Sequence, residues 1–323
     1  MDIVRFVKNW TLPISMVTGA LSYFIYVNIP QLAPTRPVVS ELINYVQPSL
    51  IFCMLFLTFC KVKPAQLKPK KWFLKLALFQ GGLFTLMGLY LAACPDTPLR
   101  LVTEGAMLCI ICPTATACAV VTMRLGGDAA IVTTYTIFIN LLVSLLAPVV
   151  LPIAHPQAGI SFLPAFYTII HKVFPLLICP LLAAWFVRYA LPSLHQYLLK
   201  FKDLAFYLWA IALALAIAIT CKSLMHTDGS IWDILGIALV SAICCLIQFV
   251  YGKWVGKKVG YKIEGGQMLG QKNTVFIIWL GYTFLSPATT IAGGCYSVWH
   301  NLMNTWQLYQ KRKADELAAK KLS

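Results

Sequence analysis

Residues 268–278 read "MLGQKNTVFII", an apolar run that is interrupted near its middle. The interruption consists of Gly270, Gln271, Lys272 and Asn273. Glycine has a weak helix propensity, and amide side chains compete with the helix for backbone hydrogen bonds. The stretch therefore predicts a helix that is broken beside a lysine, and the meaning of that lysine depends on what surrounds the helix.

The composition indicates a membrane protein. Of the 323 residues, 59% are hydrophobic and 11% are charged, and the mean hydropathy is +0.77, which is too apolar for one water-soluble core. About 20 helical residues cross a bilayer. The sequence predicts an all-α integral membrane protein, and the runs of that length lie at about 10–29, 42–60, 72–94, 99–123, 129–153, 173–191, 203–222, 231–252, 264–282 and 287–306.

The net charge is +15, and the basic residues are concentrated in every second loop. This distribution indicates the orientation of the chain in a membrane rather than binding to nucleic acid. If the N-terminus is cytoplasmic, 20 of the 26 lysines and arginines fall in inside segments. These are Arg5, Lys8, Lys61, Lys63, Lys68, Lys70, Lys71, Arg124, Arg188, Lys200, Lys202, Lys253, Lys257, Lys258, Lys262, Lys311, Arg312, Lys313, Lys320 and Lys321. The outside loops hold only Arg36, Arg100 and Lys222. We expect a multi-pass protein of the plasma (inner) membrane with both termini cytoplasmic and no cleaved signal peptide.

The eleven cysteines are odd in number and lie mostly in the predicted spans, so a disulfide framework is not expected. Cys109 and Cys112 have the spacing of a metal or redox pair, but no second pair of Cys or His accompanies them. Buried cysteine commonly packs as a small apolar residue. We therefore expect packing here, and no metal site.

Two halves of the chain have similar patterns. Residues 1–12 are amphipathic and meet Pro13, and residues 163–172 are amphipathic and meet Pro175, which suggests a proline in the first turn of the first and sixth spans. Five spans separate these points, so the second half is expected to be inverted in the membrane. The predicted units are a first repeat at 1–155, a second repeat at 156–308 and a charged tail at 309–323.

The fourth and ninth spans correspond under this plan, and both are interrupted. The fourth reads "CIICPTATACAVV" over 109–121, where Pro113 removes a backbone donor and clashes with the preceding turn. Broken helices at matching positions in inverted halves indicate a transport site. The alternative for each break alone is that Pro113 only kinks its helix and that Gly270 only permits close packing.

Lys272 lies about eight residues into the ninth span, or about 12 Å deep at 1.5 Å per residue. A charge at the centre of a membrane helix costs at least about 2.5 kcal/mol and usually faces a functional cavity. A structural alternative is that freed carbonyl groups of the broken helices satisfy the ammonium. Glu104 and Glu264, near the starts of the two spans, are expected to favour the helix dipole from the first turn.

These residues resemble the bile acid:sodium symporter family. Gly270 and Asn273 are similar to the family motif Glu-x-Gly-x-Gln-Asn, Ser297-Val298-Trp299-His300-Asn301 is similar to its tenth-span signature, and residues 112–133 resemble its fourth-span crossover. The resemblance implies a panel domain of spans 1, 2, 6 and 7 and a core domain of spans 3–5 and 8–10. Spans 4 and 9 would cross beside the substrate cavity.

The departures from the family pattern concern sodium. Met268 stands where the family has its sodium-binding glutamate, and Lys272 stands where it has glutamine. Cys118, Ala119 and Val132 replace further expected ligands, although Thr136 and Gln80 could still serve. The resemblance then implies site residues at the crossover, namely Gln80, Pro113, Thr114, Thr116, Cys118, Thr136, Met268, Gly270, Gln271, Lys272 and Asn273.

Lys272 in place of a bound cation would keep the crossover positive, which suits an organic anion such as a bile-acid-like molecule or a small carboxylate. The function expected is sodium-independent secondary transport by alternating access, without an enzymatic reaction or a cofactor. Three alternatives stay open: a sodium- or proton-coupled symporter, a cation/proton antiporter, and a metalloid efflux permease that uses Cys112 or Cys118. The expected partners are the small anion and the lipid bilayer.

Overall fold

A computed structural model describes residues 3–156, 160–201, 204–226 and 230–322, and within these ranges the protein consists of helices without a β-strand. Lys202, which belongs to the charge pattern, lies outside the described residues. The α-helices are α1 (Ile3–Asn28), α2 (Arg36–Cys60), α3 (Phe73–Ala93), α4 (Arg100–Ile111), α5 (Cys118–Leu125), α6 (Ala129–Ala154), α7 (Phe162–Ala190), α8 (Pro192–Lys200), α9 (Leu204–Met225), α10 (Ile231–Lys257), α11 (Lys262–Gly270), α12 (Thr274–Phe284) and α13 (Thr290–Leu322). Short 3-10 helices are η1 (Pro30–Thr35), η2 (Pro64–Gln66) and η3 (Pro287–Thr289).

Six helical segments are long and apolar enough to cross a membrane: Pro30–Cys60, α3, α6, α7, α9 and α10. Large apolar side chains such as Leu78 on α3 and Leu239 on α10 are exposed on their outer faces. Contiguous exposed apolar surface is unfavourable in water and suits a lipid environment. The predicted all-α membrane protein is therefore confirmed, whereas the count of ten spans and the inverted repeat stay predictions.

The predicted fourth and ninth spans are each divided into two helices. The fourth becomes α4 and α5, with 12 and 8 residues, and the ninth becomes α11 and α12, with 9 and 11 residues. None of the four is long enough to cross a bilayer alone. Every residue of α4 from Glu104 onward is buried, and so is every residue of α11 from Glu264 onward, so the breaks lie in the centre of the bundle.

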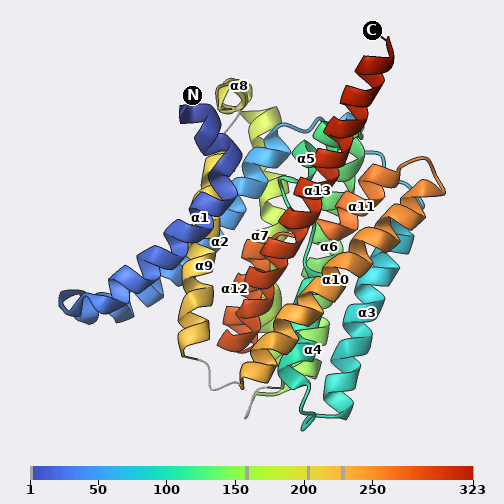
Figure 1. Ribbon diagram of the computed structural model, residues 1–323. Coiled ribbons are helices and arrows are strands. Elements are labelled where there is room, and N and C mark those ends of the chain that lie inside the picture. Colours follow the sequence, from blue (N-terminus) through green and yellow to red (C-terminus); the bar gives the residue numbers. More distant parts are fainter. Residues whose placement is uncertain (1–2, 157–159, 202–203, 227–229, 323) are drawn as a thin grey trace.

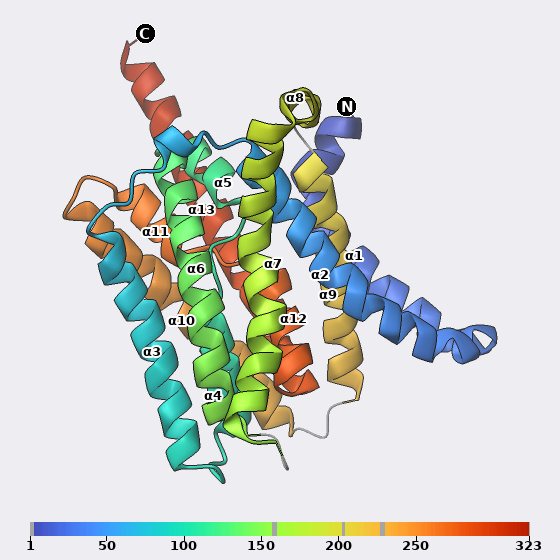
Figure 2. The ribbon, with the colours of Figure 1, turned by 180° about the vertical axis from the view of Figure 1, so that it is seen from behind.

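The remaining helices surround these broken ones (Figure 1). On one side α2 packs against α7 and α9, and α1 packs against α9; on the other, α10 packs against α4, α11 and α13, and α3 packs against α4 and α6. Figure 2 shows the hairpin of α1 and α2 projecting away from the rest of the bundle. The division into panel and core domains stays a prediction, since α6 also packs extensively along α7.

The predicted positions of two prolines were wrong. Pro13 and Pro175 lie inside α1 and α7, not in their first turns, because each amphipathic run is continuous with the span that follows it. A proline within a helix removes one backbone hydrogen bond, which packing against neighbouring helices can offset in a membrane. The helices α1 and α7 are thus longer than the apolar runs alone indicated.

The topology can be tested by cysteine labelling. The start of α1 and the end of α13 lie at the same end of the bundle (Figure 1). After Ser replaces the exposed Cys53 and Cys94, a membrane-impermeant maleimide should leave Lys68→Cys unmodified in intact cells and modify it in opened cells. Gln31→Cys, in the predicted external segment, is the matched control and should be modified in both. Modification of Lys68→Cys in intact cells would show that the protein has the opposite orientation in the membrane.

Candidate functional site: the crossing of two broken helices

The first break follows α4. The helix ends at Ile111, and Cys112 adopts an extended conformation with φ −50° and ψ 133°. Pro113, the next residue, has no N–H to donate to a continuing helix and disfavours helical backbone in the residue before it. A turn at Thr116 and Ala117 then leads into α5, which begins at the buried Cys118.

The second break follows α11. The helix ends at Gly270, and Gln271 is extended with φ −92° and ψ 99°. Asn273 then caps α12, because its side-chain oxygen accepts a hydrogen bond of 3.3 Å from the N–H of Phe276. The same residues that weaken the first helix thus begin the second one.

The two breaks pair with each other. Thr114 and Lys272 form an isolated antiparallel bridge. The N–H of Ala115 donates to Gln271 O at 2.9 Å, and the N–H of Asn273 donates to Pro113 O at 3.0 Å. In addition, the hydroxyl of Thr114 donates to Met268 O at 2.7 Å. The backbone groups released by one break therefore satisfy those of the other, which makes unwound chain tolerable at this depth.

Side chains from neighbouring helices satisfy the carbonyl groups at the ends of α4 and α11. Gln80 Nε2 on α3 donates to Ile111 O at 2.8 Å and to Cys112 O at 3.0 Å. The hydroxyl of Tyr296 on α13 donates to Gly270 O at 2.8 Å, and it accepts a bond of 3.0 Å from Gln248 Nε2 on α10. All of these donors are neutral.

Lys272 is buried at the centre of this arrangement, with only 1% of its surface exposed. Within the described residues, its Nζ has no hydrogen-bond partner and forms no ion pair. In the described part of the chain, the ionisable side chains near it are the thiols of Cys109, Cys112, Cys118 and Cys244. The structural alternative, in which freed carbonyl groups hold the ammonium, does not match this geometry, because neutral donors occupy those carbonyls.

The two nearby buried carboxylates are engaged elsewhere. Glu104 forms an ion pair with Arg100 at 3.1 Å, and its Oε1 lies 2.9 Å from His155 Nδ1, within hydrogen-bond distance. Its expected place in a first turn was wrong, because α4 begins four residues earlier, at Arg100. Glu264 does lie in the first turn of α11, and its Oε1 accepts a bond of 2.6 Å from the N–H of Asp128.

The other expected site residues divide into two groups. Gln271 is buried and contributes its backbone to the crossing, while its Oε1 has no hydrogen-bond partner in the described part of the chain. Thr116 is half-buried in the turn before α5. Thr136 lies on α6, where its hydroxyl donates to Val132 O at 3.0 Å, so it is committed to its own helix.

Sequence reasoning missed Gln248 and Tyr296. The signal for Gln248 was present, because it is a lone polar side chain in the apolar run "SAICCLIQFVY" at 241–251. Such residues within membrane helices usually face the interior. Tyr296 had no comparable signal, since its role depends on contacts with Gly270 and Gln248 that are distant along the chain.

No group of three or more His, Cys, Asp or Glu residues suited to a metal ion occurs among the residues that the structure describes. No protein-family model matches the sequence, and a comparison with curated proteins gives no match. The crossing of the two broken helices around Lys272 is therefore the candidate functional site of this protein.

Proposed function

We propose that this protein is a secondary transporter of an organic anion, and that Lys272 provides the positive charge at its binding site. The observation that carries the proposal is the burial of Lys272 at the crossing without a hydrogen-bond or ion-pair partner among the described residues. An unpaired charge in a low-dielectric interior is costly, and in membrane proteins such charges mark substrate or ion pathways.

The surrounding backbone also favours an anion. α5 begins at Cys118 and α12 begins at Thr274, so both break segments lead into the N-terminal end of a short helix. Helix N-termini carry partial positive charge and attract carboxylates. Substrate sites between discontinuous helices are a recurring feature of transporters that work by alternating access. A bile-acid-like molecule or a small carboxylate has the required charge.

The alternatives make different demands on the site. A cation/proton antiporter needs a carboxylate that is free to exchange ions, whereas Glu104 and Glu264 are both engaged by other groups. A metalloid permease would depend on the thiols of Cys112 or Cys118, and a membrane-permeant thiol-blocking reagent would then stop transport. A symporter coupled to sodium is separated from the proposal by the following experiment.

Substrate binding should not depend on sodium. Met268, Ala119 and Val132 have no side-chain oxygen to offer a hard cation, which prefers several oxygen ligands. A thermal-shift screen of the purified protein against organic anions should therefore give the same shift in sodium chloride as in N-methylglucamine chloride. A shift that disappears without sodium would contradict this prediction and favour a conventional symporter.

A further inference from the structure

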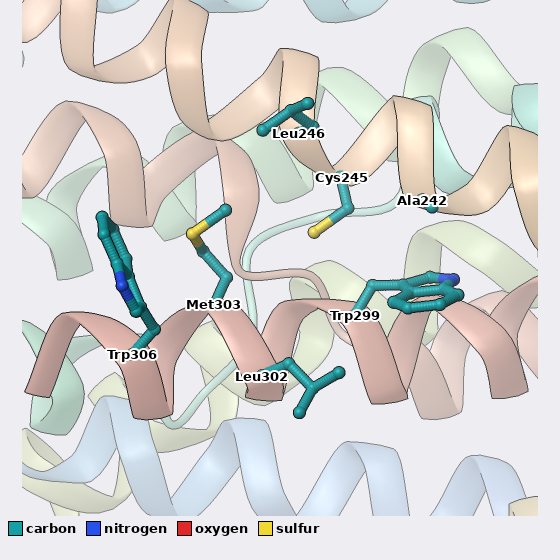
Figure 3. Close-up of a pocket in the computed structure, with 7 residues that line it drawn as sticks. All are labelled: Ala242, Cys245, Leu246, Trp299, Leu302, Met303 and Trp306. Carbon is teal, nitrogen blue, oxygen red and sulfur yellow. The ribbon is translucent and has the colours of Figure 1, made fainter. Parts of the chain in front are cut away.

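A groove of about 400 Å³ runs between α10 and α13 on the outer face of the bundle. Seven residues line it: Ala242, Cys245, Leu246, Trp299, Leu302, Met303 and Trp306. Figure 3 shows the two tryptophans at opposite ends of the groove, with the smaller side chains between them. The ring nitrogen of Trp299 is bound to Ala238 O and Ser241 Oγ at 3.2 and 3.1 Å, which fixes one end.

The other end of the groove is bordered by a cation. Lys253 on α10 is half-buried, and its ammonium lies 5.9 Å from the ring centre of Trp306 and 6.0 Å from that of Phe249. Its carbon stem lies across Gly266 of α11, where a Cβ atom would come within 2.6 Å of Lys253 Cγ. The absence of a side chain at Gly266 thus lets the lysine lie along the helices toward the groove.

Among the residues that the structure describes, this cation has no anionic partner. No ion pair of Lys253 occurs within the described ranges, and Lys262 is the charged side chain that interacts with it electrostatically. The like charges of Lys253 and Lys262 repel each other, and an anion beside Lys253 would offset this repulsion. The end of the groove is therefore positive, and its body is apolar.

We propose that the groove holds one anionic phospholipid, with an acyl chain between Trp299 and Trp306 and the phosphate beside Lys253. Apolar surface and then positive charge follow each other along the groove, in the same order as the acyl chain and the headgroup of such a lipid. Basic pockets between membrane helices bind anionic headgroups, and tryptophan suits the boundary between acyl chains and headgroups. This site is separate from the crossing at Lys272 and does not depend on the transport proposal.

Native mass spectrometry of the full chain in a nonionic detergent tests this site, with added phosphatidylglycerol or phosphatidylcholine as the probe. The wild-type protein should retain one phosphatidylglycerol in preference to phosphatidylcholine. Lys253→Gln should weaken retention of phosphatidylglycerol about fivefold, the effect of about one charge near an anionic headgroup. Lys258→Gln is the matched control and should leave retention unchanged, because Lys258 lies over the Trp254 ring at 3.5 Å and not at the groove.

A second pair of variants tests the apolar part of the groove. Ala242→Phe fills it and should reduce retention, whereas Ile243→Phe, at an exposed neighbouring position outside the groove, should not. Equal retention of both lipids by the wild type, or equal effects of Lys253→Gln and Lys258→Gln, would overturn the proposal. Unchanged retention in Ala242→Phe would place the lipid elsewhere and would overturn it as well.

Discussion

Lys272→Met should abolish anion uptake into proteoliposomes while leaving the protein folded. Methionine keeps most of the lysine stem, and removing a buried charge without a partner is neutral or stabilising, by about 1–4 kcal/mol in comparable replacements. The crossing should survive, because Gln80 and Tyr296 donate the hydrogen bonds to the carbonyl groups at the helix ends. The measurements are uptake and the melting temperature of the same preparation.

Lys272→Arg distinguishes two uses of this charge. Arginine stays protonated, whereas lysine can lose its proton when buried. If Lys272 exchanges a proton during the transport cycle, the arginine variant should bind the anion without transporting it. If the charge is constant, the arginine variant should retain partial transport, limited by the larger guanidinium group.

Two outcomes would contradict the role of Lys272. A methionine variant with unchanged uptake would show that the anion does not need this charge, and Lys272 would then have a structural role. A methionine variant that unfolds would show that the ammonium holds the crossing together despite its lack of partners in the described residues. Thr85→Val is a suitable control, because Thr85 lies outside both break segments and its hydroxyl donates to Gly81 O of its own helix, α3.

The sequence predicted both breaks because their causes are local. Pro113 cannot donate a backbone hydrogen bond, and Gly270 to Asn273 have weak helix propensity, whatever the rest of the chain does. The resemblance to the symporter family implied that the two broken spans would cross, and the bridge between Thr114 and Lys272 agrees with this. The positions of Glu104 and Pro175 were misjudged, because helix ends depend on packing beyond the local sequence.

The partners of the break segments could not be predicted in the same way. Gln248 and Tyr296 meet the crossing through contacts between α10, α13 and α11 that only the folded structure brings together. The same is true of the groove, where Trp306 and Lys253 come from different helices. A single sequence shows that a side chain is polar or aromatic, but the choice of neighbour follows from how the helices pack.

Gly252→Ala on α10 should strongly destabilise the protein. The helix packs against α11 so closely that a Cβ at Gly252 would overlap the carbonyl group of Gly265, and a Cβ at Gly265 would overlap the backbone of Gly252 in return. Backbone atoms cannot rotate away as a side chain can, so the two helices must separate. Small residues permit this type of close packing in membranes, and overpacking costs about 1–3 kcal/mol or more.

Gly82→Ala on α3 is the matched control, because no heavy atom lies within 4 Å of the position of its Cβ. Alanine there should be neutral or stabilising by up to about 1 kcal/mol, since it removes the entropic cost of glycine in a helix. Opposite changes in melting temperature are thus expected from the same chemical substitution. α11 ends at Gly270, two residues before Lys272. If α11 moves away from α10 in Gly252→Ala, Lys272 should therefore be displaced and uptake should fall. Equal melting temperatures of the two variants would contradict the close packing from which both expectations follow.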